Sequence, residues 1–105
     1  MKILFDQGTP APLRRLLPKH FIVTVYENGW HELKNGDLIR IAEDEGFDLF
    51  LTTDSNLKYQ QDMRNRTIAI VVLLSTSWPK IQKQSSAVIT AIDSATRGSY
   101  SEVHI

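Results

Sequence analysis

Three aspartates of this 105-residue chain stand where an α/β fold would bring them together. Asp6 ends the apolar run 1–5, Asp54 ends the run 48–53, and Asp37 opens the helical pattern Asp37–Glu45. If both runs are strands of a parallel sheet, Asp6 and Asp54 lie at its carboxyl edge, where open α/β sheets bind ligands. Helix N-termini lie at the same edge, so Asp37 would join them. Three converging carboxylates would hold a divalent cation.

The chemistry that suits such a cluster is metal-assisted hydrolysis of a phosphodiester. Mg²⁺ and Mn²⁺ prefer carboxylate oxygens, and a bound cation makes hydroxide from water and neutralises charge on a phosphoryl group. Each aspartate also has an ordinary structural role. Asp6 suits a turn, Asp54 suits a helix N-cap, and Asp37 suits the positive end of a helix dipole. Capping alone, however, does not require three acids to converge. Polar neighbours that could orient a water or a phosphate are Gln7, Thr53, Ser55 and Asn56.

Composition and motifs argue against several other chemistries. The chain has no cysteine, and its 12 basic and 12 acidic residues balance, so neither a Cys-based site nor general nucleic-acid attraction is indicated. The three histidines are scattered and lack the spacing of a zinc-protease helix. Gly8 stands alone in its turn, and no Gly-x-Ser-x-Gly motif is present. Trp30 and Trp78 are interpreted as packing residues.

Alternating strand and helix patterns must position the aspartates. Strands are predicted at Lys2–Phe5, His20–Tyr26, Asp48–Thr53 and Thr67–Leu74, the last buried on both faces. Helices are predicted from Thr9 to Pro18, over Asp37–Glu45, over Ser55–Met63, and as one long helix starting at Ser77–Pro79 and packing through Ile81, Val88, Ile89 and Ile92. Asn35-Gly36 is interpreted as a turn that closes the polar connection Glu27–Gly36.

These elements predict a single domain over residues 1–105, a three-layer α/β/α fold with a mostly parallel sheet of four to five strands. The tail Gly98–Ile105 is expected to be an edge strand or partly disordered. The N-terminus enters a strand directly, and the longest apolar run, Ile68–Leu74, is too short to span a bilayer. We therefore expect a cytoplasmic protein without a membrane contact.

Three segments resemble the short PIN-like domains of unknown function. These are the start through Asp6-Gln-Gly-Thr-Pro10, the segment Asn35-Gly-Asp37-Leu-Ile-Arg-Ile-Ala42, and Leu51-Thr-Thr-Asp54-Ser-Asn56-Leu. That family commonly has a strand ending in Asp-Glu-x-x-Pro, then a helix Asp-x-x-Ile-x-x-Ala, and later Thr-x-Asp-x-Asp-Phe. The resemblance covers roughly residues 1–80.

The resemblance implies a Mg²⁺- or Mn²⁺-dependent ribonuclease of the PIN superfamily, many of whose members are toxins of toxin–antitoxin pairs. The implied catalytic residues are Asp6, Asp37 and Asp54, and the implied metal ligands are these three and Asn56. RNA is the expected substrate, and a small antitoxin-like protein or a second copy of the chain is a candidate partner. The chain departs from the family pattern at two positions, because Gln7 replaces a common Glu and Asn56 a common Asp.

Two other readings stay open. The lost charges at Gln7 and Asn56 favour a weak or inactive PIN-like module that binds a small antitoxin-like protein, whereas the retained aspartates favour the nuclease. A receiver-like phosphoacceptor, with Asp54 and Thr76 at strand ends, ranks last because it lacks the acid pair after the first strand.

Overall fold

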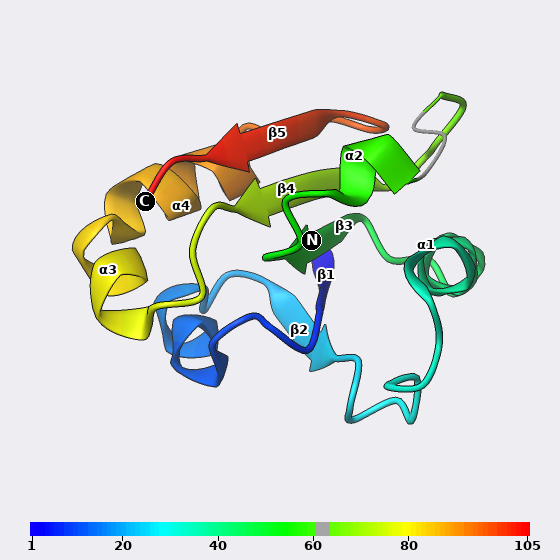
Figure 1. Ribbon diagram of the computed structural model, residues 1–105, viewed down its shortest axis with the longest axis horizontal. Helices are drawn as coiled ribbons and strands as arrows, with labels where there is room; N and C mark the ends of the chain where they lie inside the picture. Colours follow the sequence, from blue (N-terminus) through cyan, green and yellow to red (C-terminus); the bar gives the residue numbers. More distant parts are fainter. Residues whose placement is uncertain (61–63) are drawn as a thin grey trace.

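The computed structural model describes residues 1–60 and 64–105 and contains a sheet of five strands, all parallel (Figure 1). The strands are β1 (Lys2–Phe5), β2 (Phe21–Thr24), β3 (Leu49–Thr52), β4 (Ala69–Leu73) and β5 (Tyr100–Val103), in the spatial order β2-β1-β3-β4-β5. The chain therefore adds β2 on one side of β1 and β3 on the other. In such a sheet, the carboxyl ends of β1 and β3 border the topological switch point, the usual ligand crevice.

Helices lie on both faces of the sheet because successive strand residues point to opposite faces. Ile3 and Phe5 of β1 belong to a cluster with residues of η1 (Ala11–Leu16), α3 (Trp78–Lys83) and α4 (Ser85–Asp93). Leu4, between them, belongs to a second cluster with residues of α1 (Asn35–Asp44) and α2 (Leu57–Gln60). Figure 1 shows α1 on one side and α3 with α4 on the other. The predicted α/β class with a parallel sheet is confirmed, and the arrangement is compatible with three layers.

The buried strands follow the sequence pattern closely. Every residue of β3 and β4 is buried, as the apolar runs predicted. The tail forms β5, which pairs with β4 at one edge of the sheet, so the edge-strand alternative is the correct one. Trp30 packs edge-on against Phe47 at 6.0 Å, and Trp78 packs on the cluster beneath α3, so both tryptophans have the predicted packing role.

Several predicted helices were wrong in type or extent. The first is a 3-10 helix over Ala11–Leu16, and it ends there because Leu17, which precedes Pro18, has the non-helical angles φ −124° and ψ 52°. The long C-terminal helix is broken at Gln84, whose φ of −107° and ψ of 23° separate α3 from α4. The helix predicted over Ser55–Met63 is observed over Leu57–Gln60, and residues 61–63 lie outside the described residues.

The ion pair between Arg14 and Glu27 covers part of the outer edge of strand β2. Arg14 Nη2 donates to the carbonyl of Ile22 at 2.6 Å, and Glu27 Oε1 accepts from the backbone N–H of Thr24 at 2.9 Å. Arg14 and Glu27 also pair at 3.0 Å. These contacts occupy groups that would otherwise template another strand. Of the helices described, none combines the length and apolarity needed to cross a bilayer.

Candidate functional site at the carboxyl edge of β1 and β3

Asp6 is fixed at the end of β1 by both its backbone and its side chain. Its backbone N–H donates to the carbonyl of Leu51 at 2.9 Å, which extends the ladder between β1 and β3 by one residue. Its carboxylate accepts from the backbone N–H of Gln7 at 2.9 Å and from the Thr52 hydroxyl at 2.7 Å. Both donors are neutral, so the hydrogen bonds orient the carboxylate without cancelling its charge.

Asp54, two residues beyond the end of β3, is held in a similar way. Its Oδ1 accepts from the backbone N–H of Asn56 at 3.0 Å, and its Oδ2 accepts from the side-chain amide of Asn35 at 2.7 Å. Its own N–H donates to the Thr52 hydroxyl at 3.1 Å. The fully buried Thr52 hydroxyl therefore binds both strand ends, accepting from Asp54 and donating to Asp6.

Asp37 lies in the first turn of α1, and α1 begins at the same edge of the sheet. The helix starts at Asn35, whose side chain contacts Asp54. The carboxylate of Asp37, however, pairs with Arg40 at 3.0 Å, and both side chains are more than half exposed, 61% and 66%. An exposed pair of this kind contributes about 0–1 kcal/mol, so it holds Asp37 only weakly in this position.

The two residues that depart from the PIN-like pattern have different surroundings. The side-chain amide of Gln7 donates to the carbonyl of His31 at 2.7 Å, a hydrogen bond that an ionised glutamate could not make. Gln7 therefore ties the segment after β2 to the end of β1. Asn56 is exposed and contacts Asp54 through its backbone N–H.

The three aspartates at this edge differ in the charge of their hydrogen-bond partners. Within the described part of the chain, Asp6 and Asp54 accept hydrogen bonds only from neutral groups, whereas Asp37 has a cationic partner. Residues 1–60 and 64–105 contain no ready-made group of three His, Cys, Asp or Glu side chains able to hold a metal. Mg²⁺, however, is often held by one or two carboxylates together with waters and substrate phosphates. Asp6 and Asp54 fit that donor set.

A cavity of about 390 Å³ adjoins Asp6 on the side of β2. Its lining comes from the ends of β1 and β2 and from the start of η1, and it includes Phe5, Asp6, Gln7, Ala11, Val25 and Tyr26. The cavity therefore opens at the same edge as the carboxylates, with Asp6 as part of its wall.

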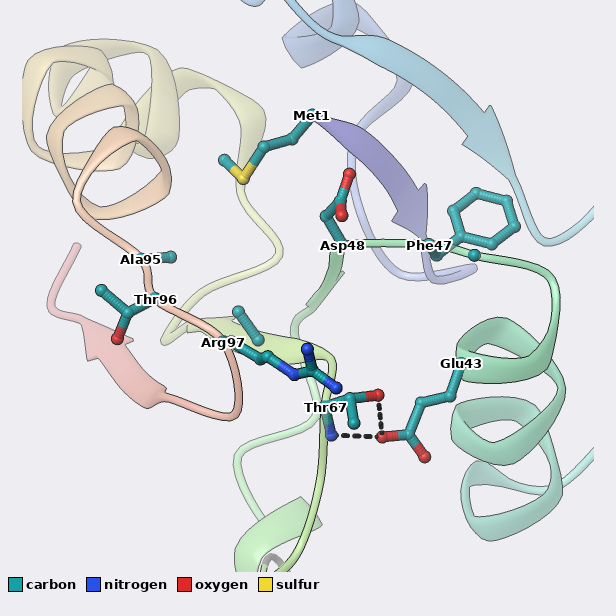
Figure 2. A pocket seen from close by; sticks show the side chains of 10 residues that line it. Met1, Glu43, Phe47, Asp48, Thr67, Ala95, Thr96 and Arg97 are labelled. Atoms are coloured by element: carbon teal, nitrogen blue, oxygen red, sulfur yellow. Dashed lines mark hydrogen bonds between the residues drawn. The ribbon is translucent and has the colours of Figure 1, made fainter.

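A second cavity, of about 400 Å³, lies at the opposite edge, near the first residues of β1, β3 and β4 (Figure 2). Glu43 lines it but is already engaged, because it accepts from Arg66 and from the backbone N–H groups of Thr67 and Ile68. Burial raises the pKa of Glu43, but these hydrogen bonds outweigh it, so the pKa lies below its ordinary value of 4.5. Glu43 serves as a structural link between α1 and the start of β4.

Sequence reasoning missed Thr52 and Asn35. The signal for Thr52 was present, because a threonine inside an otherwise apolar, buried strand needs a hydrogen-bond partner. The signal for Asn35 was misleading, because Asn35-Gly36 was interpreted as a turn. Asn35 and Gly36 are instead the first two residues of α1. The backbone N–H groups of a first helical turn have no carbonyl partner within the helix, so a turn-forming dipeptide is compatible with that position.

Comparison with known proteins assigns no relative: no family model matches the chain, and no curated protein or solved structure does so either.

Proposed function

We propose that the protein is a PIN-like, metal-dependent ribonuclease that hydrolyses RNA phosphodiesters at the carboxyl edge of β1 and β3. The observation that carries the proposal is the pair of uncompensated carboxylates, Asp6 and Asp54, joined through the buried Thr52 hydroxyl. Their position at the topological switch point adds support, because ligands of parallel α/β sheets bind there.

Asp6 and Asp54 would hold Mg²⁺ or Mn²⁺, with Asp37 and Asn56 as further ligands from the start of α1 and from the loop after β3. The cation would supply charge neutralisation at the phosphoryl oxygens and a hydroxide at neutral pH. Thr52, Asn35 and the backbone of Asn56 would keep the two carboxylates oriented while their remaining lone pairs bind the cation. In this mechanism the role of the protein is thus to hold the carboxylates of Asp6 and Asp54 in a fixed orientation.

Metal binding is tested by thermal unfolding with increasing Mn²⁺. A ligand that binds only the folded state stabilises it by about 2.7 kcal/mol at 100 times its Kd. Asp6→Asn and Asp54→Asn should abolish the Mn²⁺-dependent rise in Tm. Asp44→Asn is the matched control, because Asp44 is an exposed acid at the other end of α1. If Asp54→Asn keeps the full rise, the cation binds elsewhere and the proposed site is wrong.

Asp37→Asn separates two versions of the site. A three-acid site predicts a clear loss of Mn²⁺ affinity, whereas a site built on Asp6 and Asp54 alone predicts almost none. Cleavage of single-stranded RNA should require Mg²⁺ or Mn²⁺, stop in EDTA and fall by several orders of magnitude in Asp6→Ala. Cleavage that Asp6→Ala leaves unchanged would come from a contaminating nuclease.

One observation favours the alternative of a non-catalytic PIN-like module that binds a small antitoxin-like protein. The side-chain amide of Gln7 donates to the carbonyl of His31. The residue at the position of a common family acid therefore has a structural role here. The module predicts no metal-dependent cleavage by the wild type and none gained by Asn56→Asp. The nuclease predicts activity that Asn56→Asp preserves or raises, because the added charge tightens the metal.

A further inference from the structure

Tyr26 is a large aromatic side chain left in solvent beside the candidate site. It is 71% exposed, although it follows the buried Val25 by one residue. The neighbouring aromatic residue Trp30 is partly buried and packs on Phe47, as part of the hydrophobic core. Tyr26, in contrast, does not belong to either core cluster. An exposed aromatic ring that lines a cavity is available for a ligand.

The ring of Tyr26 is held in place despite its exposure. It stacks on the imidazole of His31, with centroids 4.6 Å apart and planes 18° from parallel. Backbone hydrogen bonds close the turn between them, from Gly29 to Tyr26 at 3.0 Å and from Trp30 to Val25 at 3.0 Å. A ring fixed before the ligand arrives loses little conformational entropy on binding.

Gln7 connects this aromatic pair to the catalytic edge. Its backbone N–H donates to Asp6, and its side-chain amide donates to the carbonyl of His31. Gln7 therefore links the carboxylate of Asp6 to the backbone of His31, whose ring belongs to the pair. Asp6 and Tyr26 also line the same cavity of about 390 Å³, a volume within the range of small-ligand sites.

We propose that this cavity receives one unpaired base of single-stranded RNA, stacked on Tyr26, so that an adjoining phosphodiester meets the edge at Asp6. The substrate class rests on the proposed function, whereas the stacking surface rests on the geometry of Tyr26, His31 and Gln7. Aromatic stacking accepts every base, because each has a π face, and it needs bases free of a duplex. The site therefore selects single strands over duplexes, with little preference for sequence.

The test measures binding of a fluorescent single-stranded RNA octamer at fixed salt in EDTA, where no metal-dependent cleavage occurs. Stacking predicts that Tyr26→Ala raises Kd roughly 5- to 150-fold, the range seen for loss of one base–aromatic stack. Tyr26→Phe and Tyr26→Trp keep a ring and should retain binding. Phe21→Ala is the matched control, because Phe21 is an exposed aromatic, 65% exposed, on β2 and outside the cavity lining. A Kd that is the same for Tyr26→Ala and Phe21→Ala overturns the proposal, as does a wild type that does not bind the octamer.

Gln7→Ala tests the positioning role. It should weaken binding in the wild type but not in the Tyr26→Ala background, because Gln7 acts through the aromatic pair. An equal loss in both backgrounds would show that Gln7 contacts RNA directly and would overturn that role. Tyr26-dependent binding without Mn²⁺-dependent cleavage supports the stacking surface and refutes the nuclease. Cleavage whose KM is unchanged by Tyr26→Ala supports the nuclease and refutes the stacking surface.

Discussion

Replacing Thr52 by valine tests whether a single hydroxyl organises the candidate site. Valine keeps the shape of the buried side chain but removes the oxygen that donates to Asp6 and accepts from Asp54. A hydrogen bond to a charged group contributes about 1.5–3 kcal/mol and one between neutral groups about 0.5–1.5 kcal/mol. Asp6 lies partly in solvent, so water can replace the hydrogen bond that it loses. Valine also removes the buried hydroxyl itself, so no side-chain polar group is left there without a partner. We therefore expect a net loss of about 2 kcal/mol.

Urea unfolding at neutral pH gives the free energy, and a loss of about 2 kcal/mol corresponds to a fall in Tm of about 10 °C for a domain of this size. The same variant should bind Mn²⁺ more weakly, since Asp6 and Asp54 lose their shared link. Two controls separate the hydroxyl from the substitution itself. Thr52→Ser keeps the hydroxyl and should keep the Mn²⁺ response, while losing about 1 kcal/mol for one buried methyl.

Thr76→Val makes the same chemical change at an exposed loop position and should change stability by less than about 0.5 kcal/mol. The proposed role of the hydroxyl is refuted if Thr52→Val is as stable as Thr76→Val and retains the full Mn²⁺ response. That result would mean that the strand ends are held by the sheet alone and that the hydroxyl adds nothing.

Two further predictions concern the supports of the sheet. Glu43→Gln should lower the free energy of unfolding by about 2 kcal/mol in urea titrations. Because the pKa of Glu43 is lowered in the folded state, the difference from wild type should be full above pH 4.5 and shrink as pH falls through the folded pKa; a difference constant down to pH 3 would contradict it. Gly98→Ala should cost about 2–4 kcal/mol, because φ is +75° and the new Cβ would lie 2.5 Å from the carbonyl of Arg66. Gly29→Ala, with φ of +71° and open space, should cost only about 1–2 kcal/mol, so equal Tm losses would refute the steric part.

Periodicity was enough for the buried sheet and too little for the helices. The runs that became β1, β3 and β4 are short and apolar, and a parallel strand covered on both faces has that pattern for a physical reason. The break at Gln84 could not be seen in the same way. Ile81, Val88 and Ile92 keep a helical spacing across it, since both α3 and α4 present them to one hydrophobic cluster. Core contacts determine which face of a helix is buried, but they do not determine whether the helix is continuous.

Some features of the candidate site could likewise be predicted from the sequence, and others could not. The positions of Asp6, Asp37 and Asp54 could be predicted from the strand ends and the helix start. The alternation of strands and helices determines which residues lie at that edge of the sheet. The hydrogen bonds that hold Asp6 and Asp54 depend on side-chain partners remote in sequence, such as Thr52 for Asp6 and Asn35 for Asp54. A single sequence carries no direct signal for such pairs. The hydrogen bond from Gln7 to the carbonyl of His31 could not be predicted from the sequence for the same reason.

The three aspartates differ in how firmly they are held, and this difference bears on how a cation would assemble the site. Among the residues that the structure describes, Asp6 and Asp54 each accept two hydrogen bonds from neutral donors, so a cation would not have to break an ion pair with any of these residues. Asp37 would have to leave Arg40, but that exposed pair is worth at most about 1 kcal/mol. A divalent cation carries twice the charge of Arg40, so at equal distance its Coulomb attraction for the carboxylate would be twice as large. The Mn²⁺ titration of Asp37→Asn therefore tests whether Asp37, the weakly held acid, would join a cation bound by Asp6 and Asp54.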